Sequence, residues 1–498
     1  MSITGPGSVT AINVAAVTNM NNQLDQLNEE LATGDASQTY SGLGSQAGVA
    51  LLLNAQLSAI TGYTTAATTA GTTLSLAQSI LTQLGDSSNA VQQSIGEQGA
   101  FSLNNNGQTS TQASASTELD QILSVLNTQV GGNYLFSGNA VNQPSVASMN
   151  DILNGNGAQA GLTQVISERE QADLGTSGLG RLTVGGSGAN VTLSQDGSPF
   201  GFQLSSVNST LTGAAVSGPS GSPPTISVAL GSNPNAGDTI QFNLTLPDGS
   251  SQTISLKATT TSPPGAGQFA IGANASATAA NLQTALTGAI TTLAQTQLPA
   301  ASAVAAANEF FNNDPPLRVS GAPATSTSLV AGTSANTVFW YTGGNSSAPQ
   351  QTVTAQIGPS TTIAYGLQAN EPAISSLIAN VAVLATTTYS ASNPNAQASY
   401  QALSSKVATN LSSPSGTQSI DDIEANLANA QTEITNANSL NAQTQTTLQD
   451  MLQNIEGINQ NQVGEQLLTL QNSLSASLSV TARLAQESLV NFLSPSTG

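Results

Sequence analysis

The chain has 498 residues, with no Cys, no His, and six Lys or Arg against 26 Asp or Glu, which gives a net charge of −20. These counts exclude disulfides and thiolate metal sites, remove the commonest general base, and argue against nucleic acid, whose phosphates require clustered basic side chains. Charged residues make up only 6% of the chain, so its surface must consist mainly of amides and hydroxyls. We therefore expect no enzymatic activity and no cofactor.

Residues 1–42 are predicted to contain a terminal amphipathic helix whose polar face carries almost no charge. Its start offers no basic segment before an apolar run, as a Sec signal peptide requires. No apolar run approaches the roughly 20 residues of a membrane span. A helix lying on a membrane is disfavoured because such helices carry Lys or Arg on the polar face. The apolar face is predicted to include Ile12, Met20, Leu24, Leu27 and Leu31.

Residues 43–138 are predicted to form the N-terminal half of a helical core. From Ile60 to Ile95 apolar residues recur in alternating steps of three and four, the 3.5-residue repeat of a supercoiled helix. A Gly- and Asn-rich break at 103–107 predicts a turn, after which the helix returns antiparallel. Expected core residues in the two segments are Leu74, Leu81, Leu84, Ile122 and Leu126.

Residues 139–370 hold most of the Pro and Gly and are predicted to form a β-rich outer insert of one or two domains, mostly strands, turns and loops. Thr239–Leu246 alternates apolar and polar residues, meets a Pro-Asp-Gly turn, and the alternation resumes at Thr253–Leu256, which predicts a β-hairpin. A helix is expected over 274–298, and further strands over 338–341 and 352–357.

Residues 371–458 are predicted to form the C-terminal half of the core. Steps of four and three continue from Ile423 to Ile458, and the seam includes Met451, with Asn441 and Thr444 as polar interruptions. A polar residue on such a seam usually fixes its register. Expected core residues here are Ile423, Leu427, Ile434, Leu448 and Ile455.

Residues 459–498 are predicted to form a second terminal helix with the same nearly uncharged polar face. A lone helix of this kind is marginal in water, so both chain ends need partners. The predicted fold is mainly α: a helical coiled-coil core formed by both chain ends, complete without the β-rich α+β outer domain inserted between them. The apolar face of the last helix is predicted to include Leu467, Leu470, Leu474, Leu478, Leu489 and Phe492.

Several short motifs, taken in order, resemble the bacterial flagellin family. The segment 132–138 is similar to the end of the helical core in hook-associated protein 3 and related flagellins. Residues 31–34 and 40–44 look like the "LSTG" region of flagellins, and 476–493 resembles the family's last helix. Residues 172–181 are similar to a segment of some alphaproteobacterial members. The residues of the first motif are Tyr134, Leu135, Phe136, Ser137 and Gly138.

The resemblance covers about residues 1–180 and 371–498, and it implies a structural subunit that polymerises into the flagellar filament for motility. Such a subunit is extracellular, leaves through the flagellum's own type III apparatus without a Sec signal, and uses its terminal helices as the inner tube. The implied partners are copies of itself, an export chaperone and hook-associated proteins, but not nucleic acid or membrane. We expect an alphaproteobacterial-type flagellin. Hook-associated protein 3 at the hook–filament junction is the alternative that the segment 134–138 favours, and a secreted adhesin is the alternative of another class.

Overall fold

The computed structural model describes residues 6–97, 101–412 and 418–493, and side chains within these ranges from 11 to 486. The chain divides into two compact units. We name the first, Met1–Ala70, Ala355–Ile363 and Thr432–Gly498, the terminal unit. The second, Gly71–Thr354 and Ala364–Gln431, is the central unit. Helices α2 (Ala47–Gly96) and α9 (Ile420–Glu456) contribute residues to both units.

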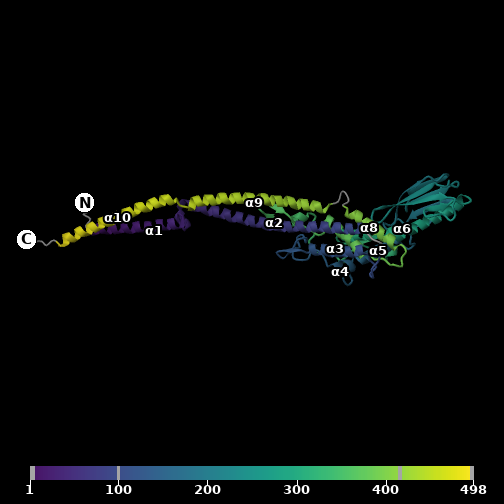
Figure 1. Ribbon diagram of the computed structural model, residues 1–498, viewed down its shortest axis with the longest axis horizontal. Coiled ribbons are helices and arrows are strands. Elements are labelled where there is room, and N and C mark those ends of the chain that lie inside the picture. Colours follow the sequence, from purple (N-terminus) through teal and green to yellow (C-terminus); the bar gives the residue numbers. More distant parts are fainter. Residues whose placement is uncertain (1–5, 98–100, 413–417, 494–498) are drawn as a thin grey trace, which may run out of the picture. The chain divides into compact units, whose positions relative to one another are not determined.

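The terminal unit is built from both ends of the chain. Helix α1 (Pro6–Thr33) packs lengthwise against α10 (Gln460–Leu493), and the two run side by side in Figure 1. A 3₁₀ segment, η1 (Tyr40–Gln46), leads from α1 into α2. The fold class predicted from the sequence is confirmed: long helices near both ends of the sequence flank a central β-rich region.

The end of α1 is tied to the end of α9 by backbone hydrogen bonds. Ala36 N donates to Glu456 O at 2.6 Å, and Ile458 N donates to Gly34 O at 3.0 Å. Gly34 has φ of +82° and its N–H bonds back to Glu30 O at 2.8 Å, which is the left-handed helix stop that glycine favours. The motif at 31–34 therefore ends α1. The hydrogen bonds of Gly34 and Ala36 fix this end of α1 to the end of α9.

The buried face of α9 departs from the predicted strict repeat. The series Leu427, Ile434, Asn441, Leu448 and Ile455 keeps its seven-residue spacing, and its members are buried or half-buried. The predicted seam positions between these residues are not the buried ones. Thr444 and Met451 are exposed. The residues that follow them, Gln445 and Leu452, are half-buried instead. An α-helix has 3.6 residues per turn and drifts about 20° per heptad, so the buried stripe moves toward later positions. The helix ends at Glu456, so Ile458 lies beyond it.

Asn441 joins α9 to a short hairpin of β13 (Thr354–Gln356) and β14 (Thr362–Ala364). Its Nδ2 donates to Ile357 O at 3.0 Å, and both residues are buried. The Asn441 amide and the Ile357 backbone carbonyl thus satisfy each other, since a buried polar group without a partner is costly. The polar interruption predicted on the seam therefore has a structural partner outside the helices.

In the described residues of the central unit there are six further helices, more than the sequence predicts. They are α3 (Ser110–Leu126), α4 (Met149–Asn154), α5 (Leu162–Leu174), α6 (Ala275–Phe311), α7 (Pro372–Thr386) and α8 (Ala396–Leu411). Helix α5 falls in the zone predicted as strands and loops, because its buried face carries the charged pair Arg169 and Asp173 rather than a plain apolar stripe. The expected helix 274–298 continues through Pro299 to Phe311, since the small apolar residues after the proline are buried against other helices.

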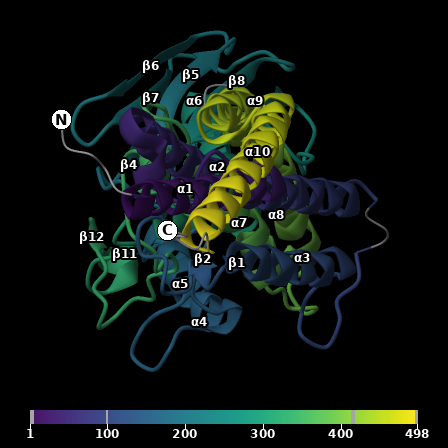
Figure 2. The same ribbon diagram turned by 90° about the vertical axis from the view of Figure 1, so that its left-hand side faces the viewer.

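Two four-stranded sheets form the β-rich part of the central unit, and Figure 2 shows the labelled strands β4–β8 gathered beside α6. The first is ordered β3-β4-β7-β6 and is antiparallel, and the second is ordered β10-β9-β8-β5, with only β10 parallel to its neighbour. Leu282, Leu286 and Ile290 of α6 share the core between them. The strands are β3 (Leu182–Gly185), β4 (Asn190–Gln195), β5 (Gln203–Ser209), β6 (Ala214–Ser220), β7 (Thr225–Leu230), β8 (Thr239–Thr245), β9 (Ser251–Thr259) and β10 (Gln268–Ala270).

The hairpin predicted around the Pro-Asp-Gly turn is present as β8 and β9, with Phe242 opposite Ile254 and Ile240 opposite Leu256. The strands expected at 338–341 are not formed: Tyr341 makes only an isolated bridge to Val146. The remaining short strands are β1 (Gln129–Val130), β2 (Asn133–Tyr134), β11 (Leu317–Val319) and β12 (Leu329–Ala331), and short 3₁₀ turns lie at η2 (Pro323–Thr325) and η3 (Pro349–Thr352).

The segment 134–138 lies where the chain enters the predicted insert, and it is hydrogen-bonded to the segment where the chain returns. Gly138 N donates to Leu367 O at 3.0 Å, and Ala369 N donates to Phe136 O at 2.9 Å. Phe136 is fully buried, and Gly138 has φ of +61° with no room for a Cβ beside Gly344 O. The motif therefore connects, through these hydrogen bonds, the two segments at which the predicted insert begins and ends.

The expectation that the helical core is complete without the insert is wrong. Helix α7 belongs to the predicted core, yet it is buried along most of its length between α3 and α6, and α6 also packs along α8. Because α6 lies inside residues 139–370, removing that range would expose the apolar surface of α7. The sheets, by contrast, pack chiefly on one another and on the first half of α6.

Candidate assembly surface

The contact between α1 and α10 uses one apolar stripe from each helix. On α1 the half-buried positions include Val17, Met20, Leu24 and Leu27, at helical spacing. On α10 the corresponding stripe contains buried Val463 and half-buried Leu467, Leu470 and Leu474. Of the α1 side chains described, residues 11–33, none is fully buried. The pair therefore covers only part of its own apolar surface.

A second set of apolar side chains on the same helices is exposed. Ile12 is 65% exposed, and Leu31 and Leu478 are 40% and 50% exposed. These three predicted seam residues are exposed, whereas the other described ones are half-buried. The side chains of Leu489 and Phe492 lie outside the described residues. Sequence reasoning missed further exposed members of this set: Val14, Leu468, Val480 and Leu484.

The first turns of α2 continue the uncovered apolar surface of the terminal unit. Val49, Leu51 and Leu52 are between 47% and 60% exposed, whereas Leu53 and Ile60 pack against Leu448 of α9. This apolar character also gives Tyr40–Gly96 an 18-residue window apolar enough to cross a membrane by length and composition alone. Exposed apolar side chains on a folded unit mark a surface that another surface covers.

The predicted core residues all lie on helices of the two units. Leu74, Leu81, Leu84, Ile122 and Leu126 are almost inaccessible in the central unit, as are Ile423 and Leu427. Ile434 and Leu448 are buried in the terminal unit, where Ile455 is half-buried against the cluster around Leu448.

Charge is distributed very unequally between the two units. The ranges of the terminal unit hold one basic residue, Arg483, against nine Asp and Glu. Contacts between copies of this unit therefore cannot rest on many ion pairs, and apolar and amide groups must supply most of the attraction. Four of the other five basic residues make ion pairs in the central unit: Arg169, Arg181, Arg318 and Lys406.

The most deeply buried ion pairs centre on Arg169. Its Nε donates to Asp173 Oδ2 at 2.8 Å, Nη1 bonds to Glu309, and its guanidinium lies 5.1 Å from the centre of the Phe200 ring. Burial raises the pKa of both Asp173 and Glu309 despite the adjacent cation. Burial, with repulsion from Asp173, also raises the pKa of Glu170 to about 7. These groups hold α5 to α6, and among the described residues no cluster of three or more acidic side chains could hold a metal.

The segment 172–181 also has a structural role. Arg181 adopts φ of +67°, a conformation that costs a non-glycine residue about 1–2 kcal/mol. Its side chain bonds to Ala172 O at 2.6 Å, Asp196 at 3.0 Å and Ser326 O at 2.9 Å, which offsets that cost. The motif therefore connects the end of α5 to the first sheet.

Long helices from both chain ends, with apolar faces that the chain itself leaves uncovered, define a structural subunit of a helical polymer. Residues 8–141 match the family model of the bacterial flagellin N-terminal helical region. A search of curated proteins gave no match. Residues 8–141 are therefore a bacterial flagellin N-terminal helical region, and this match supports a structural subunit of the flagellar filament. The match gives no better support to hook-associated protein 3, and the alphaproteobacterial type stays a prediction.

Proposed function

We propose that the chain polymerises through its terminal unit, with α1 and α10 forming the inner tube of the filament and 139–370 carried on the outside. The observation that supports this is the set of exposed apolar side chains on α1, α10 and the start of α2, around Ile12, Leu51 and Leu478. Burial of apolar surface is worth about 25 cal/mol per Å². Repeated along every copy, these faces supply a driving force for assembly that few ion pairs could replace.

The proposed domain division follows from the same surface. Residues 1–42 and 459–498 would supply the inner tube, and 43–138 with 371–458 the helical core around it. The packing of α6 on α7 and α8 means that the outer insert, 139–370, also completes that core. The sheets β3–β10 are then the part free to differ without altering polymerisation.

We further propose the partners and route that suit such a subunit. It would leave the cell through the flagellar export apparatus without a Sec signal, held by a chaperone and meeting hook-associated proteins at the filament base. The exposed apolar side chains of α1 and α10 form surfaces that a chaperone would cover before assembly. No catalytic activity is proposed, because Ser and Thr have no His base in this chain.

Truncation tests the proposal. Deleting Ser2–Leu31 or Leu467–Gly498 removes one partner of the α1–α10 pair and leaves the core of the central unit, with Leu81 and Leu126, intact. We expect each truncated protein to remain a folded monomer, with a thermal transition close to that of the full chain, and to give no elongation in seeded light-scattering assays. Filaments of normal length from either truncation would contradict the assignment of these helices to the inner tube.

A further inference from the structure

A cavity of about 320 Å³ lies in the central unit, away from the terminal helices. It is formed by the end of α6, the turn that follows, the segment 339–345 and the first turn of α7. Ligand sites for small molecules typically occupy about 300–1,000 Å³ and combine apolar walls with a few placed polar groups. The cavity meets both conditions, and nothing in the assembly of helices requires it.

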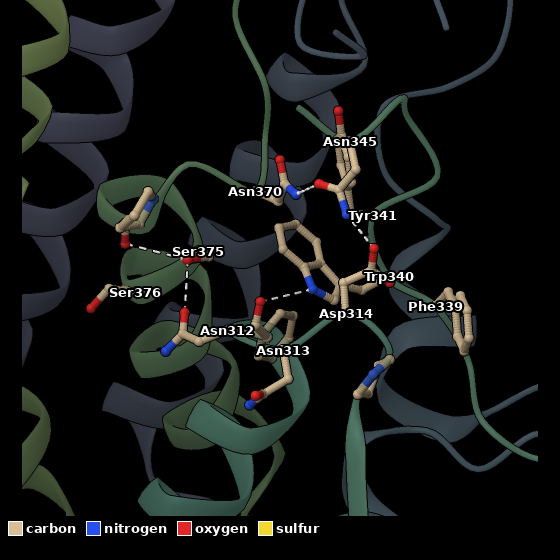
Figure 3. Close-up of a pocket in the computed structure, with 13 residues that line it drawn as sticks. Asn312, Asn313, Asp314, Phe339, Trp340, Tyr341, Asn345, Asn370, Ser375 and Ser376 are labelled. Carbon is tan, nitrogen blue, oxygen red and sulfur yellow. Dashed lines mark hydrogen bonds between the residues drawn. The ribbon is translucent and has the colours of Figure 1, made fainter. Parts of the chain in front are cut away.

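Aromatic side chains make its apolar wall. Phe311 and Trp340 are almost fully buried with ring centres 5.3 Å apart, and Trp340 Nε1 donates to Phe311 O at 3.1 Å. Tyr341 and Phe339 also line the cavity and are only partly buried. In Figure 3 Trp340 lies at the centre, with Asn370 and Asn345 on one side and Asn312 and Asn313 on the other. The wall is therefore fixed by packing and by a buried hydrogen bond before any ligand arrives.

The polar rim consists of amides, hydroxyls and one carboxylate. Asn370 donates to Asn345, which in turn donates to Asp314 Oδ2. This relay orients the amides and uses Oδ2 of Asp314, which is an exposed residue. Ser375 Oγ donates to Asn312 Oδ1 at 2.7 Å, and Ser376 adds a hydroxyl to the lining. A rim that mixes donors and acceptors in this way suits a ligand whose groups both donate and accept, as hydroxyls do.

The lining contains no Lys or Arg. Phosphate, sulfate and carboxylate ligands normally require such groups, so the rim disfavours anions. One carboxylate already engaged by Asn345 is also a weak centre for a free cation. We propose that this cavity binds a neutral sugar ring, with its C–H face on the partly exposed side chains of Phe339 and Tyr341 and its hydroxyls on Asp314 and the surrounding amides.

The full-length monomer should be titrated with methyl glycosides of neutral hexoses by saturation-transfer NMR and calorimetry. We expect saturable binding of at least one glycoside, with a Kd on the order of 1 mM, typical of few contacts in a shallow site. Asp314→Asn should weaken binding about tenfold and Phe339→Ala by a similar factor, because one removes the charged acceptor and the other the apolar wall. Asp120→Asn, an exposed carboxylate on α3, is the matched control and should bind as the parent does.

Inorganic phosphate and methylammonium serve as charged probes. The proposal predicts no saturable binding of either at the same concentrations. Binding of one of them in place of the glycosides, failure of every neutral hexose to saturate, or binding that survives both Asp314→Asn and Phe339→Ala would overturn it. Filament assembly does not enter this test, so its outcome is independent of the proposed polymerisation.

Discussion

Replacing Arg169 with Met should lower the free energy of unfolding by about 3–5 kcal/mol, the usual cost of breaking a buried ion pair by removing one partner. The loss is large because Asp173 and Glu309 would keep their buried positions without a cation. Asp173 would retain the hydrogen bond from Gly201 N at 2.7 Å, which does not replace the lost cation. Chemical denaturation of the monomer, followed by circular dichroism, measures the change.

The loss should also depend on pH in a definite direction. Burial already raises the pKa of Asp173 and Glu309, and removing Arg169 raises both further. A carboxyl whose pKa is higher in the folded state loses stability as pH rises through the interval between its unfolded and folded pKa. The gap between variant and parent should therefore shrink when the pH is lowered toward 4. Lys257→Met, which removes an exposed cation, is the control, and an equal loss in both variants would contradict the account.

Replacing Ile434 with Asp should cost about 4 kcal/mol or more, because it removes a buried apolar side chain and introduces a carboxylate without a partner. Ile434 is only 2% exposed, and it belongs to the series on α9 that keeps its seven-residue spacing. A marginally stable unit cannot absorb a loss of this size, so the melting transition of the terminal unit should broaden or disappear. Differential scanning calorimetry of the monomer follows that transition directly.

Asn436→Asp is the matched control for this substitution. Asn436 is exposed on the same helix two residues away, so the same carboxylate remains in water there. We expect its midpoint to stay within about 1–2 °C of the parent, since surface substitutions rarely exceed 0.5 kcal/mol. Comparable midpoints for the two variants would mean that α9 has no buried seam at Ile434.

Helices whose apolar residues repeat regularly were predictable from the sequence, and those with mixed faces were not. The spacing around Leu81 and Ile434 follows α2 and α9 because most residues of their buried stripes are apolar. Helix α5 escaped prediction because its buried face includes Arg169 and Asp173. The second half of α6 was missed because Pro299 normally ends a helix, whereas here tertiary packing carries the helix beyond it.

The candidate assembly surface was predictable only in part. Sequence spacing places Met20, Leu24 and Ile12 on one seam, because all three recur at helical intervals. The structure distinguishes them, since Met20 and Leu24 are half-buried while Ile12 is 65% exposed. A periodic pattern identifies which residues are apolar on a helix, but it does not say which of two apolar faces the chain itself covers. Leu468 and Val480 were missed for the same reason.

We propose that the apolar side chains left exposed on the terminal helices drive assembly. Leu468→Asp and Leu478→Asp test it most directly, because these side chains are 61% and 50% exposed in the single chain. The control is Val330→Asp, an exposed apolar site, 45%, on β12 of the central unit. The measurement is the rate of elongation from preformed filament seeds, with the thermal midpoint of each monomer determined alongside. We predict unchanged midpoints for all three variants, loss of elongation for the two leucine variants, and normal growth for Val330→Asp. Normal elongation by Leu468→Asp and Leu478→Asp would contradict the claim.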